Sequence, residues 1–226
     1  MTDWLAPLLI GALTQSPRPA AAAEPKETSM SDQPPTQTPT QQLAAALTAA
    51  STAVAKLMQT LQLSLGALRE EGFTALMVGT VQDQDPDVLV PSFPNEPKTG
   101  ADLIWIDKAS GGKKLFLIQA KRLNPLTLQY DELDHTVGST GKLQVDLLLE
   151  TTAGIDEEAQ DEGGFAKAYY FFYNFNPLSS ADNGIFWLPA DVVKTLVSQG
   201  KTSLAALKKS SFYQPLSAFA NEVGLG

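Results

Sequence analysis

The sequence predicts an α/β protein in which a mixed β-sheet is flanked by helices and preceded by a disordered arm. Residues 42–71 are rich in Ala, Leu, Gln and Met and contain no Pro, which is typical of one or two helices. Short runs rich in Val, Ile, Leu and aromatic residues follow, and Gly and Pro turn signals separate them. Apolar residues return to helical spacing at 142–152, before the aromatic run at 168–175. We therefore expect the order helix, strand, strand, strand, helix, strand.

The beginning of the chain is of low complexity. It contains several Pro residues, an alanine run and a Ser/Gln/Thr/Pro run at 31–40. Such a composition buries too little apolar surface to fold by itself. We predict a disordered arm over residues 1–40 and one domain over residues 41–226, with the helix at 42–71 as its N-terminal extension.

Neither export nor membrane insertion is expected. Residues 4–13 imitate the apolar part of a secretory signal, but Asp3 stands where such signals carry positive charge. Thr, Gln, Ser and Lys56 interrupt the apolar residues of 42–71 too often for a bilayer span. We expect a cytoplasmic protein whose N-terminal helices are buried, form a homo-oligomer or bind a partner protein. Met30 is an alternative start, which would remove the preceding residues from the native protein.

The later elements are bounded by turn residues. A second helix is expected at 73–81, before a turn signal rich in Asp and Pro. The expected strands lie at 88–93, 101–107, 114–121, 168–175 and 184–188, and the expected later helices lie at 142–152 and 189–197. Gly111 and Gly112 make the second and third strands a hairpin, and Pro189 suits a first helical turn.

The composition restricts the chemistry. There is no cysteine and His135 is the single histidine, which excludes disulfides, zinc fingers and thiol nucleophiles. A metal would therefore be held by oxygen atoms, which points to Mg²⁺ or Mn²⁺. The formal net charge of -9 opposes binding of phosphates, although residues 98–142 are slightly basic. The charge pattern permits a nucleic-acid partner without requiring one.

The candidate site lies where one strand of the hairpin begins and the other ends. Asp102 opens the first strand, and Gln119 and Lys121 close the second. Alternate residues of a strand share a face, so Gln119 and Lys121 point the same way, and pairing can bring Asp102 beside them. A carboxylate and an amide oxygen can hold a divalent cation, while an ammonium stabilises charge on a phosphate or orients the attacking water. These are the roles that phosphodiester hydrolysis needs, although an ordinary polar strand end would explain the residues singly.

The motifs Gly100-Ala101-Asp102 and Gln119-Ala120-Lys121, in this order of elements, resemble those of the PD-(D/E)XK nuclease superfamily. The resemblance implies a restriction-endonuclease-like core, with Asp102 and Gln119 as ligands of Mg²⁺ or Mn²⁺ and Lys121 as the catalytic lysine. Gln119 departs from the commoner Asp or Glu. A neutral ligand at that position is expected to weaken metal binding.

The same resemblance implies an acidic residue on the helix that precedes these strands. Glu71 is our choice as a further metal ligand and catalytic residue, and its neighbour Glu70 is nearly as well placed. Glu96 is a third possible carboxylate, ranked lower because it lies in a Pro-flanked loop.

The chain is also similar to an uncharacterised bacterial family of small nuclease-like proteins, some of them found near defence systems. The resemblance covers residues 70–174 and leaves both ends unassigned. The matching positions are 70–74, 99–102, 119–123, Tyr130, Leu133, His135, 141–148, Tyr170, Phe172, Tyr173 and Asn174. It implies hydrolysis of nucleic acid, for which we favour DNA over RNA, by a bacterial defence effector.

Gln144 and Arg122 are the expected substrate contacts. Gln144 lies on the helix after the lysine strand, where a polar side chain facing the sheet could reach a phosphate, and an exposed helix position explains it equally well. Arg122 follows Lys121 on the opposite strand face, where a surface charge is the simpler explanation. The alternative function is a non-catalytic nuclease-like binding or assembly module, which the neutral Gln119 and the negative charge favour.

Overall fold

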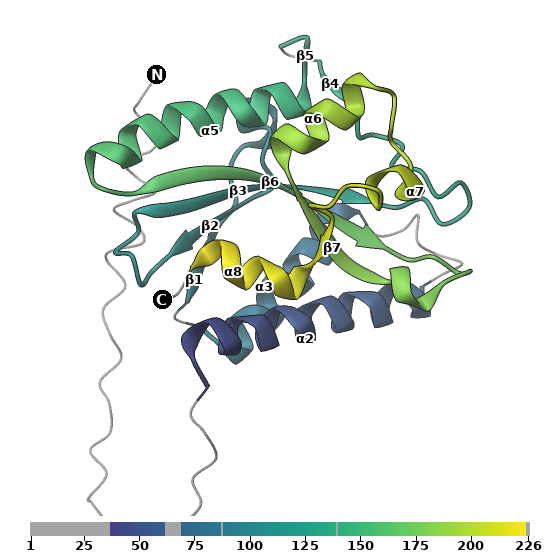
Figure 1. The fold of residues 1–226 in the computed structure, drawn as a ribbon, viewed down its shortest axis with the longest axis horizontal. Helices are drawn as coiled ribbons and strands as arrows, with labels where there is room; N and C mark the ends of the chain where they lie inside the picture. The colour runs from purple at the N-terminus through teal and green to yellow at the C-terminus, as the bar shows by residue number, and fades with distance from the viewer. Residues whose placement is uncertain (1–36, 62–68, 87, 139, 225–226) are drawn as a thin grey trace, which may run out of the picture.

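The computed structural model describes residues 37–61, 69–86, 88–138 and 140–224. A mixed sheet of six strands runs through it in the order β1-β2-β3-β6-β7-β8 (Figure 1). The strands are β1 (Leu89–Ser92), β2 (Leu103–Asp107), β3 (Lys114–Arg122), β6 (Phe165–Asn174), β7 (Gly184–Pro189) and β8 (Gln214–Pro215). β3 and β6 are parallel, and the other neighbouring pairs are antiparallel. The predicted mixed sheet flanked by helices is confirmed.

Most of the predicted arm lies outside the described residues, and its predicted end at residue 40 is too late. Helix α2 (Pro39–Thr60) already contains residues 39 and 40. Thr38 caps this helix, because its hydroxyl accepts from the Gln41 backbone N–H while the Gln41 side chain accepts from the Thr38 N–H. Pro39 follows at the first helical position, where its missing N–H costs no hydrogen bond.

The apolar stripe of α2 belongs to the core on one face of the sheet. Helix α2 packs against α3 (Glu70–Gln84) and α8 (Phe219–Val223), and together they cover Trp105 and Phe171 of the sheet. The buried residues of α2 are Leu43, Ala46, Leu47, Ala50, Val54 and Met58. Because the domain already covers this stripe, the apolar face of α2 is not available to a partner.

A second helical layer covers the opposite face. It consists of α5 (Gln144–Asp161), α6 (Ala190–Ser198) and α7 (Leu204–Leu207). Helix α5 links the parallel strands β3 and β6, which need such a crossover. Its buried Val145, Leu148 and Ile155 pack with Leu117 and Phe172 of the sheet. Both faces of the central strands are therefore buried, which explains the continuous aromatic run of β6.

The predicted elements differ from the observed ones chiefly at their ends. The helix predicted at 142–152 continues to Asp161, and the helix predicted at 73–81 spans Glu70–Gln84. The segment taken for a Pro-flanked loop contains the short helix α4 (Glu96–Thr99), and a small hairpin of β4 (Thr136–Val137) and β5 (Lys142–Leu143) precedes α5. The C-terminal part, expected to be helical, contains α7, strand β8, a 3₁₀ turn (Leu216–Ala218) and α8.

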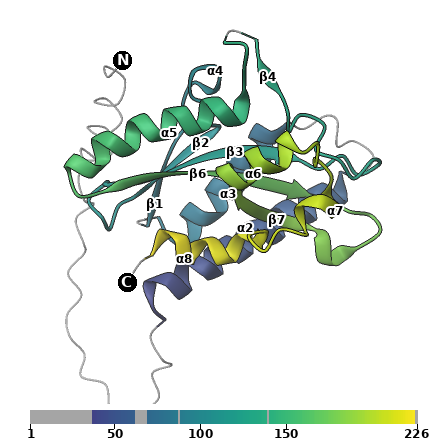
Figure 2. The same cartoon turned by 45° about the horizontal axis from the view of Figure 1, so that its top comes forward.

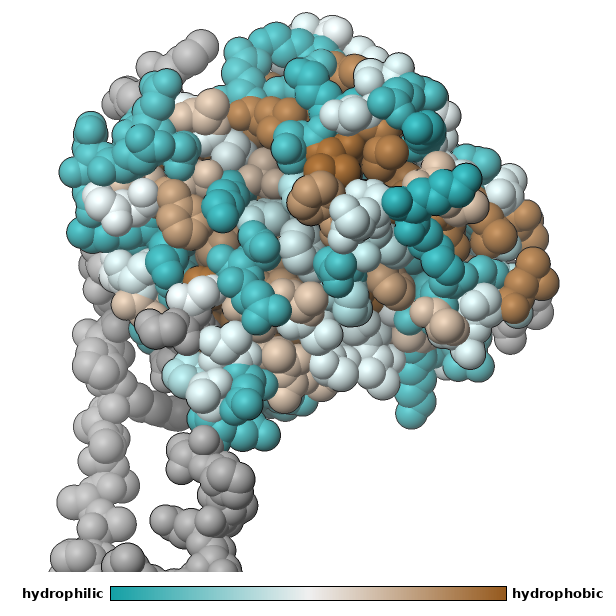
Figure 3. Space-filling model, viewed as in Figure 1, coloured by the Kyte–Doolittle hydropathy of each residue, from teal (hydrophilic) through white to brown (hydrophobic). Residues whose placement is uncertain are grey.

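No helix in the described parts of the chain is both long and apolar enough to span a bilayer. On the face shown in Figure 3, apolar residues form separate patches between hydrophilic ones. Scattered apolar residues of this kind are normal for protein surfaces.

Candidate functional site

A cleft of about 820 Å³ opens where β2 begins and β3 ends. The starts of α3, α4 and α5 and the loop after β3 form its walls. Figure 2 shows α4 next to the N-terminal end of α5, above the sheet. All six predicted site residues line this cleft: Glu71, Asp102, Gln119, Lys121, Arg122 and Gln144.

Gly100 allows this arrangement of α4, α5 and β2. It ends α4 in a left-handed conformation with φ of 71°, and a Cβ atom there would lie 2.7 Å from the backbone nitrogen of Leu148 in α5. Only glycine tolerates both the conformation and the close approach. The chain can thus turn directly from α4 to Asp102 while the start of α5 remains against the sheet.

Asp102 is fixed to β3 by both its backbone and its side chain. Its backbone N–H donates to the Ile118 carbonyl at 2.9 Å, which extends the β2–β3 ladder. Its Oδ2 accepts from the Gln119 side-chain amide at 2.6 Å and from the Ala120 backbone N–H at 2.7 Å. Pairing of the hairpin therefore brings Asp102 and Gln119 into contact.

The Asp102 carboxyl lies in an environment that disfavours its charge. Its pKa is raised to about 7, chiefly by burial and also by the carboxylates of Glu96 and Glu70, while the Ala120 N–H and the Lys121 ammonium oppose the shift. A carboxyl of this kind is half protonated near neutral pH. A cation placed beside it would favour the charged form.

Two buried amide oxygens face this region without a hydrogen-bond donor. Gln119 and Gln144 are each 2% exposed, and the Oε1 atom of each has no partner among the described residues. The hydroxyl of Tyr170, which lies opposite Gln119 in the β3–β6 register, has none either. Buried polar groups are normally satisfied, so oxygen atoms left in this state point to a missing donor or cation.

Lys121 is the cation of the cleft whose charge lowers the pKa of Asp102. Its side chain is 6% exposed, and none of the ion pairs formed within the described segments involves it. Its Nζ atom is not among the fully buried polar atoms without a partner, so the ammonium is accessible from the cleft. The same property makes Lys121 a ready contact for an anionic group that enters the cleft.

Both acidic residues at the start of α3 line the cleft, but the structure favours Glu70 over Glu71. Glu71 is exposed, whereas Glu70 is half-buried and close enough to raise the pKa of Asp102. Helix α3 is held over this end of the sheet by a buried hydrogen bond of 2.8 Å between Thr74 Oγ1 and the Tyr173 hydroxyl. Glu70 is thus the one of the two whose charge acts on Asp102.

Glu96 lies at the site, although from the sequence we rank it below Glu71 and Glu70 as a possible carboxylate. It is the first residue of α4, it lines the cleft, and it raises the pKa of Asp102 more than Glu70 does. Its Oε1 accepts from the Gln144 side-chain amide. The sequence hides this role because α4 has only four residues, follows Pro94 closely and contains Pro97.

Gln144 and Arg122, the predicted substrate contacts, both line the cleft. Gln144 is buried at the start of α5 rather than exposed. Arg122 and Lys121 lie on opposite faces of β3, but Arg122 still reaches the cleft because the strand ends there. His135 also lines the cleft and is exposed.

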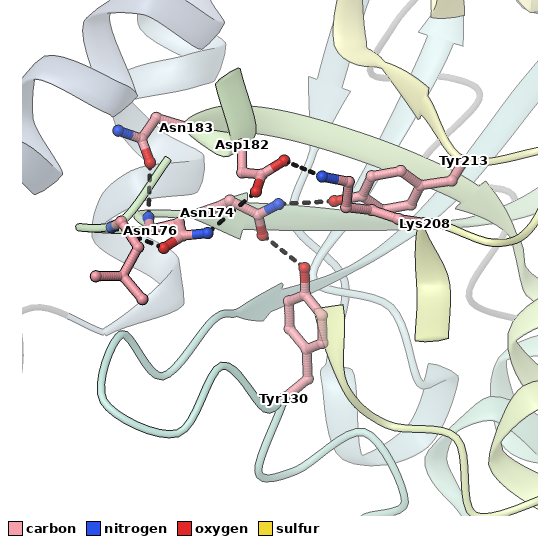
Figure 4. Close-up of polar contacts among 8 residues, drawn as sticks. Tyr130, Asn174, Asn176, Asp182, Asn183, Lys208 and Tyr213 are labelled. Carbon is pink, nitrogen blue, oxygen red and sulfur yellow. Dashed lines mark hydrogen bonds and ion pairs between the residues drawn. The ribbon is translucent and has the colours of Figure 1, made fainter. Parts of the chain in front are cut away.

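Sequence reasoning missed a polar network behind the cleft (Figure 4). Tyr130, which lines the cleft, donates to Asn174 Oδ1 at 2.6 Å, and Asn174 Nδ2 donates to the Tyr213 hydroxyl at 2.7 Å. Beside it, Asp182 accepts from Asn176 and pairs with Lys208, which lowers the pKa of Asp182 against the effect of its burial. These residues are far apart in the sequence, so only the fold could join them.

The residues of the cleft fit a hard divalent cation. No group of three or more His, Cys, Asp and Glu side chains in the described portion of the chain is arranged to hold a metal. The available ligands are instead a mixture of carboxylate and amide oxygens, above all Asp102 and the donorless Oε1 of Gln119, with Glu70 and Glu96 nearby. Oxygen ligands of both kinds suit Mg²⁺ and Mn²⁺.

Comparison with known proteins gives a family without an assigned activity. No curated protein and no solved structure matches the chain. One family model matches residues 43–222, from α2 to α8, and thus covers the sheet, both helical layers and the cleft. The chain therefore belongs to DUF6615, a family of unknown function.

Proposed function

We propose that the protein hydrolyses phosphodiester bonds of nucleic acid with the help of Mg²⁺ or Mn²⁺, and that DNA is preferred to RNA. One observation carries the proposal: the Asp102 carboxylate, the donorless oxygen of Gln119 and the unpaired ammonium of Lys121 share one cleft. Their motifs resemble those of the PD-(D/E)XK nucleases. A bacterial cytoplasmic defence effector is the setting that this proposal suggests.

The proposed roles follow from the chemistry of each side chain. Asp102 and Gln119 would hold the metal, with Glu70 or Glu96 completing its oxygen ligands directly or through water. When bound, the metal would polarise the phosphate and activate a water molecule. Lys121 would contact a phosphate oxygen and stabilise the charge that develops there.

Gln144 and Glu96 would act together at the edge of this site. The Gln144 amide donates to Glu96, so the Gln144 Oε1 and the free carboxylate oxygen of Glu96 are available as acceptors. Such acceptors can orient a water molecule beside the phosphate. Arg122 is placed to contact the adjoining part of the nucleic-acid backbone.

A second candidate function is a non-catalytic binding module. The cleft is lined by the carboxylates of Glu70, Glu71, Glu96, Asp102, Asp131 and Glu132 and by only three permanently charged cations, Arg69, Lys121 and Arg122. This balance repels a polyanion until a metal is bound, and the neutral Gln119 weakens the attraction for that metal. If the protein hydrolyses nucleic acid, the metal should therefore bind before the nucleic acid does.

Cleavage assays with purified full-length protein distinguish the two candidates. Linear DNA and RNA would be incubated with Mg²⁺, with Mn²⁺ or with a chelator, using wild type, Lys121→Ala and the control Lys56→Ala, whose residue is exposed on α2. We expect metal-dependent cleavage by wild type and the control, and a loss of about 100-fold or more in Lys121→Ala. Equal behaviour of all three proteins on every substrate would exclude catalysis.

The same assay identifies the helix acid. Glu70→Gln should lower the cleavage rate more than Glu71→Gln, because Glu70 is half-buried and interacts with Asp102 while Glu71 is exposed. The reverse order would restore Glu71 as the acidic residue of the site.

A further inference from the structure

The loop after β3 presents an apolar tip at the mouth of the cleft. Leu126 is 92% exposed, follows Pro125 and lines the same cleft as Lys121 and Arg122. A ligand bound to these two cations therefore has the leucine in the same cleft. Exposed leucines are common on protein surfaces, so exposure alone would assign no role to Leu126.

The tip is held in one conformation by Asn124. Its Oδ1 accepts from the backbone N–H groups of Leu126 at 3.0 Å and of Thr127 at 3.4 Å. Its Nδ2 donates to Asp131 at 2.7 Å, and its own carbonyl accepts from the Leu128 N–H at 2.8 Å. Leu126 is thus fixed outward, and it loses little backbone freedom when a ligand binds.

The base of the loop is strained. Leu128 has a φ of 54°, and it is the one non-glycine residue with positive φ among those described. Two contacts with the α7 segment enforce this conformation, because the Leu128 carbonyl accepts from the Leu204 N–H and the Tyr130 N–H donates to the Thr202 carbonyl, both at 3.0 Å. A bulky residue in this region of φ is unfavourable, and such strain gathers at sites that clamp ligands.

We propose that Leu126 packs against an unstacked base of the bound nucleic acid, so that the site prefers single strands and distorted duplexes to intact duplex. The inference rests on the proposed function and specifies its substrate. A nucleotide carries an anionic phosphate and an apolar base face within one residue, which matches the cations and the apolar tip of this cleft. In an intact duplex the base faces are covered by stacking, and the tip would meet only the charged backbone.

The test compares three DNAs of one sequence: a single strand, a perfect duplex and a duplex with a mismatched centre. Cleavage by full-length wild type, Leu126→Ala and Leu126→Met would be measured with Mg²⁺ and Mn²⁺. Leu178→Ala is the matched control, because Leu178 is 85% exposed but does not line the cleft. A 2-aminopurine base in each DNA would report unstacking through its fluorescence.

Wild type should cut the single strand and the mismatched duplex faster than the perfect duplex. Leu126→Ala should lower kcat/KM on the two favoured DNAs by about tenfold, the loss expected for removing one buried leucine contact. Leu126→Met should keep most of the rate, and Leu178→Ala should match wild type. The 2-aminopurine fluorescence should rise on binding to wild type and change less with Leu126→Ala.

Two results would overturn the inference and leave hydrolysis itself intact: equal rates for Leu126→Ala and Leu178→Ala on every DNA, or fastest cleavage of the perfect duplex. A wild-type chain that neither binds nor cuts any of these DNAs with either cation would contradict the proposed function and this inference with it.

Discussion

The Asp102 carboxylate accepts a hydrogen bond of 2.6 Å from the Gln119 side-chain amide, while the amide oxygen of Gln119 stays buried without a donor. The contact turns the nitrogen of Gln119 toward the carboxylate and leaves its oxygen for another group.

Gln119→Glu should tighten binding of Mg²⁺ and Mn²⁺ by roughly tenfold, because it adds a charged oxygen ligand beside Asp102. Calorimetric titration of the purified protein measures the affinity. Gln199→Glu is a suitable control, since Gln199 lies at the end of α6 and does not line the cleft. Unchanged or weaker metal binding in Gln119→Glu would place the metal elsewhere.

Metal affinity should depend on pH through Asp102. Its pKa is raised to about 7, so below this pH a proton competes with the cation, and the affinity should rise roughly tenfold per pH unit until the carboxyl is ionised. In Asp102→Asn this dependence should disappear together with most of the affinity. A flat profile for wild type between about pH 5 and pH 8 would contradict the assignment.

In the metal-free protein, the contribution of Asp102 to the free energy of unfolding should fall as the pH rises, whereas the metal affinity rises. Because the pKa of Asp102 is higher in the folded protein than in the unfolded chain, its contribution is full below about pH 4 and is lost as the pH rises through about 7. Asp102→Asn cannot ionise. Urea unfolding in a chelator should therefore show Asp102→Asn gaining stability relative to wild type from about pH 4 to pH 8. A constant difference would mean that Asp102 is not buried as described.

Lys121→Met should separate stability from function. Replacing a largely buried side chain by an apolar one of similar length should change the free energy of unfolding by no more than about 1 kcal/mol, while cleavage is lost. Lys56→Met, at an exposed position on α2, should change neither property. Marked destabilisation by Lys121→Met would instead indicate a structural role for the lysine.

Gly100→Ala should destabilise the protein more than Gly111→Ala does. Both glycines have positive φ, 71° and 72°, so both substitutions carry a backbone penalty of about 1 kcal/mol. Only at Gly100 would the new Cβ atom clash with a backbone, that of Leu148. Thermal unfolding should therefore show a clearly larger loss for Gly100→Ala, and equal losses would mean that α4 and α5 can separate without cost.

The sequence by itself determined the class of fold and the place of the candidate site. Two short apolar runs and the Gly111-Gly112 turn between them specify the β2–β3 hairpin, because hairpin pairing is local in the chain. Asp102 and Gln119 lie on that hairpin, so their contact could be anticipated. The helical layers were likewise visible in residue spacing, with errors mainly at their ends.

Only the tertiary structure decided which other residues join Asp102 and Gln119 in the cleft. Glu70, Glu96, Gln144 and Tyr130 come from separate segments, and their meeting depends on how α3, α4 and α5 pack on the sheet. The burial of Lys121 and of the donorless amide oxygens, and the pKa of Asp102, are also consequences of packing. Local sequence carries hydrogen-bonding and spacing preferences, whereas burial and long-range contacts arise only when distant segments cover one another.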